Sequence, residues 1–81
     1  MAKLDKIRAK ILGGQSDANI AFDDLCYLFS KLDFRERTKG SHFIFTKAGV
    51  VERINLQRHG SEAKPYQVKQ VREFLENNPQ L

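Results

Sequence analysis

The stretch FRERTKGSHFIF, residues 34–45, decides how the rest of the chain is interpreted. In its first half, cationic residues occupy every second position, and its second half is rich in residues that favour β structure. A period of two is typical of a strand, because successive side chains point to opposite faces. Gly40 separates the halves. We therefore predict two adjacent strands, the first with a cationic face formed by Arg35, Arg37 and Lys39.

A third strand is predicted over residues 50–57. Apolar and polar side chains alternate there, with Ile54 and Leu56 in one phase and Asn55 and Gln57 in the other. The pair Ala48-Gly49 just before it favours a tight turn. Such short connections predict that the three strands form an antiparallel meander.

Helical patterns flank the strands. Apolar side chains recur at three- and four-residue spacing over residues 22–32 and again after Pro65, which suits the first position of a helix. Asp33 lies at the end of the earlier helix, in a turn that favours Gly and tolerates Asp. A further short helix is predicted over residues 3–12, and we expect it to pack loosely against the rest.

The predicted order is an N-terminal helix followed by α-β-β-β-α. A three-stranded sheet needs a cover for its apolar face, and the two flanking helices can pack side by side on one face. This α+β layout is that of double-stranded-RNA-binding domains. With 81 residues, we expect one domain over residues 1–81, in which residues 1–14 extend a core at 22–77.

Composition restricts the partners and the compartment. The formal net charge of +4 favours a polyanionic partner such as RNA, DNA or an acidic protein. Cys26, the single cysteine, has apolar neighbours and is expected in the core. The two histidines show no spacing typical of a zinc site, so we expect neither a metal nor a cofactor. No apolar run reaches the roughly 20 residues of a membrane span and no signal peptide is evident, so a cytoplasmic protein is expected.

His42 is the first candidate for chemistry. Histidine is the side chain best suited to move a proton near neutral pH. RNA carries its own nucleophile, the 2′-hydroxyl, so a base beside cations that hold the phosphate can cleave the strand without a metal. The alternative is an ordinary histidine at the start of a strand, and the spacing alone favours that alternative.

Four further side chains suit contact with RNA. Ser41 is a turn residue whose hydroxyl can hydrogen-bond a phosphate. Lys64 lies at the start of the last helix, where backbone N–H groups also favour an anion, and Tyr66 can stack on a base. His59 could be a second proton-transfer group or a phosphate contact. Solvated surface residues are the simpler interpretation for Lys64 and His59.

The order of these pieces resembles a known family. The helix end Leu32-Asp33-Phe34 is followed by the cationic strand and by Gly40-Ser41-His42; later come Ile54-Asn55-Leu56, His59-Gly60 and Lys64-Pro65. Over roughly residues 22–75 the chain resembles the HicA toxins of bacterial type II toxin–antitoxin systems. This family usually has Gly where this chain has Asp33.

The resemblance implies a double-stranded-RNA-binding-like fold, ribosome-independent mRNA cleavage, a catalytic histidine at His42, and a HicB-type antitoxin that covers the site. We therefore expect a metal-independent endoribonuclease, monomeric when free, whose RNA contacts are Arg37, Lys39, Ser41, Lys64 and Tyr66. The alternatives are a non-catalytic module that binds RNA or protein, and a toxin relic without activity. The N-terminal helix would be a stabilising addition or, less simply, a docking element for the antitoxin.

Overall fold

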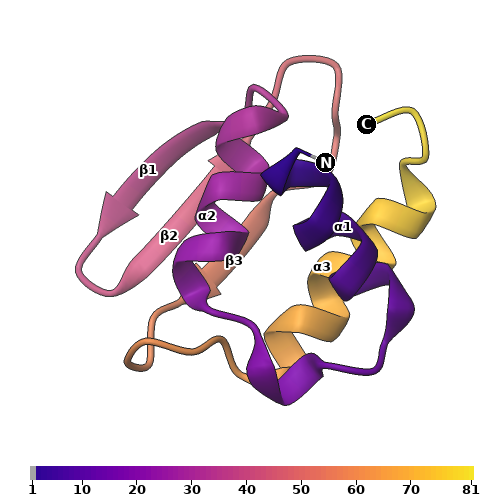
Figure 1. The fold of residues 1–81 in the computed structure, drawn as a ribbon. Helices are drawn as coiled ribbons and strands as arrows, with labels where there is room; N and C mark the ends of the chain where they lie inside the picture. Colours follow the sequence, from indigo (N-terminus) through magenta and orange to yellow (C-terminus); the bar gives the residue numbers. More distant parts are fainter. Residues whose placement is uncertain (1) are drawn as a thin grey trace.

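The computed structural model describes residues 2–81, whose helices and strands are shown in Figure 1. The elements are α1 (Lys3–Gly13), a 3₁₀ turn η1 (Asp17–Asn19), α2 (Phe22–Lys31), β1 (Arg35–Lys39), β2 (His42–Thr46), β3 (Ile54–Gln57) and α3 (Pro65–Asn77). The predicted α+β order, an extra N-terminal helix before α-β-β-β-α, is confirmed. The 3₁₀ turn lies between α1 and α2. Among the described residues, no helix has the length and apolar character needed to cross a membrane.

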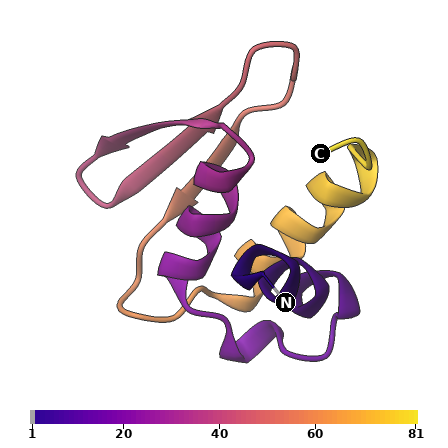
Figure 2. The ribbon, with the colours of Figure 1, turned by 45° about the horizontal axis from the view of Figure 1, so that its top comes forward.

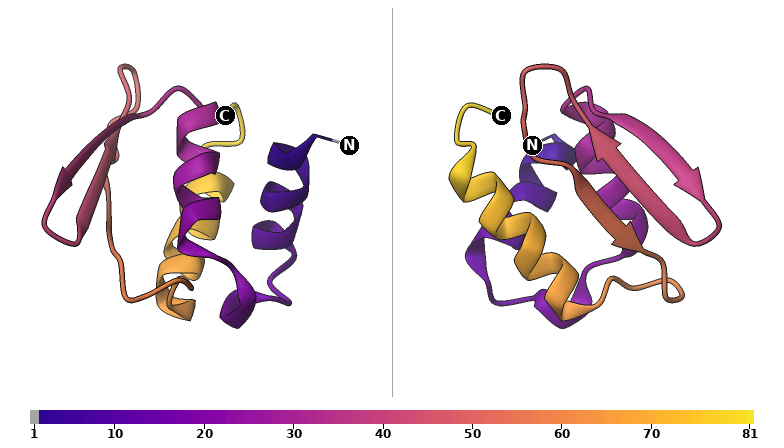
Figure 3. Two further views of the ribbon diagram at one scale, coloured as in Figure 1. Left: turned by 60° about the vertical axis from the view of Figure 1, so that its left-hand side comes forward. Right: turned by 180° about the vertical axis from the view of Figure 1, so that it is seen from behind.

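The elements form three layers, which Figure 3 shows edge-on. The sheet has the order β1-β2-β3 with antiparallel neighbours. Helices α2 and α3 lie together on one face of it, and α1 packs on this helix pair from the side away from the sheet (Figures 2 and 3). Within residues 2–81, no helix covers the opposite face of the sheet, so its outward side chains face solvent.

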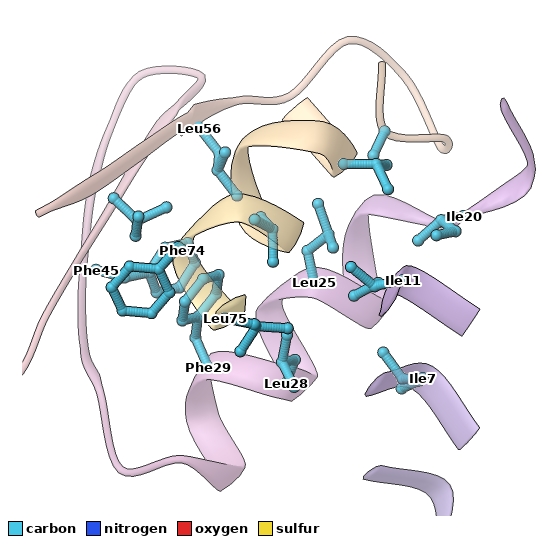
Figure 4. Close-up of a cluster of buried hydrophobic side chains, with 14 of the residues drawn as sticks. Ile7, Ile11, Ile20, Leu25, Leu28, Phe29, Phe45, Leu56, Phe74 and Leu75 are labelled. Atoms are coloured by element: carbon cyan, nitrogen blue, oxygen red, sulfur yellow. The ribbon is translucent and has the colours of Figure 1, made fainter. Parts of the chain in front are cut away.

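An apolar core fills the space between the sheet and the α2–α3 layer (Figure 4). The Phe29 ring stacks on the Phe45 ring with centroids 4.6 Å apart. The rings of Phe22 and Phe43 pack edge to face, with centroids 5.1 Å apart. Both phases of β2 contain apolar residues, so the sequence pattern alone does not decide which phase faces the helices. Phe43 and Phe45 do so, and His42 therefore lies on the outer face because neighbouring residues of a strand point oppositely.

Helix α1 is more firmly packed than we predicted. The side chain of Ile11 is completely buried and that of Ile7 is nearly so. The Arg72 guanidinium of α3 also donates to the backbone carbonyl of Ile11 (3.3 Å) and to the carboxylate of Asp17 (2.8 Å). The expectation of loose packing was wrong, because two isoleucines one helical turn apart give α1 an apolar stripe that the α2–α3 pair buries.

The third strand is shorter than predicted. It covers Ile54–Gln57 and not residues 50–57. The turn at Ala48-Gly49 does form, with the N–H of Val50 donating to the carbonyl of Lys47 (3.1 Å), but strand pairing does not follow it. Residues 47–53 form an irregular connection, in which Val51 is fully exposed.

The register explains this difference. Pairing continued directly from the Ala48-Gly49 turn would place Glu52 opposite Phe45, on the core face. In the observed register Ile54 is opposite Phe45 and Leu56 is opposite Phe43, and both β3 side chains are buried. Apolar cross-strand pairing on the buried face therefore determines the register, and the longer connection accommodates it.

Asp33 ends α2 as the sequence predicted. Its φ angle of 65° places it in the left-handed region. The N–H of Phe34 donates to the carbonyl of Phe29 (2.9 Å), and the N–H of Asp33 donates to that of Ser30 (3.1 Å). These are the two bonds of a Schellman motif, which reverses the chain and directs it into β1.

Candidate functional site

The Gly40-Ser41 turn joins β1 to β2 and determines where His42 lies. Lys39 and His42 are paired residues, so the loop between the strands has only two residues. Gly40 has a φ of 60° and Ser41 does not have a positive φ, which is the pattern of a type II′ hairpin turn. This turn makes His42 the first residue of β2, exposed on the uncovered face of the sheet.

A cationic row lies on the same face as His42. Residues that pair across an antiparallel sheet share a face, and the register pairs Lys39 with His42, Arg37 with Ile44 and Arg35 with Thr46. All three cationic residues are exposed. The predicted cationic face of β1 is therefore next to the histidine, where it can attract a phosphate backbone.

His42 also borders a surface hollow of about 270 Å³ between the sheet and the start of α3. Tyr66 contributes to it and is 61% exposed, so its ring is accessible to a ligand. The remaining lining side chains are amides, from Asn55, Gln57 and Gln67. A hollow with an imidazole, a phenol and several amides offers hydrogen bonds to a nucleotide and one aromatic surface for a base.

Ser41 is held by contacts to β3 and the residue after it. Its hydroxyl oxygen accepts a hydrogen bond from the side-chain amide of Gln57 (3.3 Å), and its carbonyl accepts one from the N–H of Arg58 (2.9 Å). Arg58 is itself fixed, because its guanidinium lies over the ring of Phe22 (4.7 Å) and pairs with Asp23 (2.5 Å). The turn next to His42 is thereby connected to both β3 and α2.

Lys64 and His59 do not line the His42 hollow. They border a second hollow of about 300 Å³, together with Ala18, Ser61, Glu62, Ala63 and Pro65. Both hollows are lined by the start of α3, residues 64–65 in one and residues 66–67 in the other. Of the predicted site residues, the structure brings His42 and Tyr66 into one hollow, places Arg37 and Lys39 on the adjoining face, and leaves Lys64 at the neighbouring hollow.

Three lining residues were not predicted. Asn55 and Gln57 occupy the polar phase of β3, and knowledge of the register would have placed them beside His42. Gln67 has the sequence context of a solvated helix residue, but it is 2% exposed. A Gln in the first helical turn is a capping signal, but it indicates neither burial nor a bond to β3. Among residues 2–81, no three His, Cys, Asp or Glu side chains cluster closely enough to hold a metal ion.

Comparison with known proteins gives one match. A family model described as the HicA toxin of bacterial toxin–antitoxin systems matches residues 22–76. The chain belongs to the HicA toxin family. HicA toxins are ribonucleases of type II toxin–antitoxin systems, and a toxin of this kind implies an antitoxin partner. The HicA match begins with α2 and includes both hollows except for Ala18, while α1 lies outside it. No curated protein and no solved structure matches the chain.

Proposed function

We propose that this chain is a metal-independent endoribonuclease that cleaves mRNA, with His42 as its general base and acid. The observation that supports this best is the position of the imidazole. It is exposed at the edge of a hollow of nucleotide-binding character, and Lys39 is its direct neighbour across the hairpin. Its place in the chain also matches the Gly-Ser-His motif of the HicA family.

In the proposed reaction the neutral imidazole of His42 takes the proton of a ribose 2′-hydroxyl. The 2′-oxygen then forms a bond to phosphorus as the bond from phosphorus to the 5′-oxygen breaks, and the His42 imidazolium returns its proton to that departing oxygen. The phosphate carries its negative charge throughout, and nearby cations stabilise the additional charge of the transition state. No step requires a metal, because the base and the counter-charges come from side chains.

The cationic and aromatic residues supply binding. Arg37 and Lys39 would contact the phosphates beside the cleavage point, and Ser41 would orient one of them. Lys64, in the neighbouring hollow, would hold a phosphate farther along the strand. Tyr66 would stack on a base next to His42, a contact worth about 1–3 kcal/mol in other proteins. A HicB-type antitoxin would inhibit the toxin by covering the same face.

A non-catalytic RNA-binding module is the second candidate, because the cationic face would also suit binding without cleavage. The two candidates differ in the effect of His42→Ala on RNA integrity. We expect this variant to lose about 10²–10⁴-fold in cleavage rate while it still binds RNA. Thr46→Ala, on the same strand and face but outside the hollow, is the matched control.

The assay uses purified protein and single-stranded RNA, with and without EDTA, and thermal unfolding to verify that each variant is folded. Cleavage by the wild type in EDTA that His42→Ala lacks and Thr46→Ala retains supports the proposal. If His42→Ala cleaves at the wild-type rate, the assignment of His42 is wrong. If the wild type binds RNA but never cleaves it, the binding module is the better description.

A further inference from the structure

We propose that Gln67 is a positioning residue that fixes the start of α3, and with it Tyr66, relative to His42. This inference rests on the proposed ribonuclease function. It concerns a buried side chain whose two polar ends connect the two elements that line the hollow.

Gln67 is a buried polar residue in the first turn of α3, next to the completely buried Val68. A buried amide is unfavourable unless it is hydrogen-bonded. Both of its ends are. The side-chain nitrogen of Gln67 donates to the carbonyl oxygen of Gln57 (2.6 Å), and its side-chain oxygen accepts from the backbone N–H of Lys64 (3.2 Å).

The bond to β3 reaches the residue that faces His42. The N–H of Arg58 donates to the carbonyl of Ser41, so Ser41 and Arg58 form a hydrogen-bonded pair. Because such pairs alternate along an antiparallel ladder, the next pair, His42 and Gln57, has no backbone hydrogen bonds between its two residues. In such a pair the side chains are close, and the backbone carbonyls point away from the partner strand. The Gln57 carbonyl therefore faces the free edge of β3, where it accepts the hydrogen bond from the side-chain amide of Gln67.

The bond to Lys64 fixes the other side of the hollow. Lys64 precedes Pro65, the first residue of α3, and Tyr66 lies between this point and Gln67. One amide thus ties both the helix start and the strand opposite the imidazole. An apolar side chain of equal length would fill the same space but would leave the Gln57 carbonyl and the Lys64 N–H without this partner.

Two variants separate positioning from helix capping. Gln67→Met keeps the length and removes both bonds. Gln67→Glu keeps an oxygen that can cap the N–H of Lys64, as Glu commonly does at this helix position, but offers no N–H to the Gln57 carbonyl. Val71→Ala is the matched control, because Val71 is a completely buried residue one turn farther along α3 whose apolar side chain can form no hydrogen bond to Lys64 or Gln57.

We measure kcat and KM for RNA cleavage at a temperature at which all variants are folded. We expect Gln67→Met and Gln67→Glu to lose about 10- to 100-fold in kcat, the range typical of a misplaced catalytic geometry, with a smaller change in KM. Val71→Ala should lose stability but retain kcat. If Gln67→Glu cleaves like the wild type, Gln67 is only a helix cap. Equal losses in Val71→Ala would show a general effect of destabilisation. Either result overturns the proposal.

A second measurement does not depend on activity. The NMR signals of the His42 imidazole and the Tyr66 ring should both shift in Gln67→Met and stay in place in Val71→Ala. If the wild type cleaves no RNA, the proposed function fails while these shifts still report on the geometry. If neither signal moves in Gln67→Met, Gln67 does not position them, whatever the activity.

Discussion

Lys39 lies directly opposite His42 across the β1–β2 hairpin. Because the two residues close a two-residue turn, their relative position is fixed by the hairpin and does not depend on the helices. His42 therefore has a cationic residue as its cross-strand neighbour on the open face. Arg37 and Arg35 continue the same row along the strand.

Removing one positive charge from the cationic row of β1 should lower the affinity for RNA and make that affinity less dependent on salt. The slope of log affinity against log salt concentration is negative. For Lys39→Gln we expect it to become shallower by about 0.7, the value for one phosphate contact on a single strand. Lys6→Gln removes the same charge from the exposed surface of α1 and should leave the slope unchanged. The measurement is titration of an uncleavable 2′-O-methyl RNA at several salt concentrations. Equal slopes for the wild type and Lys39→Gln would contradict the prediction.

Helix α1 should contribute to stability through its buried stripe. Ile11→Ala removes a completely buried side chain and should lower the free energy of unfolding by about 2–5 kcal/mol. Leu12→Ala, at the next position but 41% exposed, should cost far less. Urea unfolding measures both. Similar losses for the two variants would mean that α1 does not pack in solution as it does in this structure.

The ion pair between Asp17 and Arg72 predicts acid sensitivity. The hydrogen bond from Arg72 lowers the pKa of Asp17 below its ordinary value of 3.8. A lowered folded pKa contributes stability that is complete above the ordinary pKa and is lost as the pH falls through the folded value. The stability difference between the wild type and Asp17→Asn should be constant near neutral pH and should narrow below about pH 4. Urea unfolding at a series of pH values tests this, and a difference that stays constant into acid would contradict it.

Cys26 should react slowly with alkylating agents. The thiol packs against the core in a partly buried position, and this burial, with a smaller effect of the nearby Glu36 carboxylate, raises its pKa to about 11. The thiolate is the reactive form, so alkylation at neutral pH should be slower in the folded protein than in urea. Mass spectrometry after timed iodoacetamide treatment measures both rates. Equal rates would show that the thiol is not protected.

The fold could be predicted from the sequence because the spacing of side chains differs between a helix and a strand. The apolar stripe of α2 and the alternation around Gly40 each required only neighbouring residues. The start of β3 could not be predicted in this way, because it depends on which residues of β2 are opposite Ile54 and Leu56. That choice is made by packing across the sheet, between residues distant in the chain.

In the candidate site, too, some features depend on neighbouring residues and others on packing between distant segments. The position of His42 at the start of a strand after Gly40-Ser41 could be predicted, since a hairpin turn and a strand start are local features, whereas its assignment as a catalytic residue came from the family resemblance. That Tyr66 shares its hollow, whereas Lys64 borders another, follows from how α3 meets β3. The role of Gln67 depends on the Gln57 carbonyl at the strand edge, which no pattern within α3 indicates.

The layer that α1 forms has a practical consequence. The helix begins on the side of the molecule farthest from the open sheet face (Figure 3). A tether or fluorescent label attached before Lys3 would extend from the side of the protein opposite the open sheet face. Immobilised in this way on a sensor surface, the toxin would present its cationic row and His42 to the solution, free to meet RNA or an antitoxin.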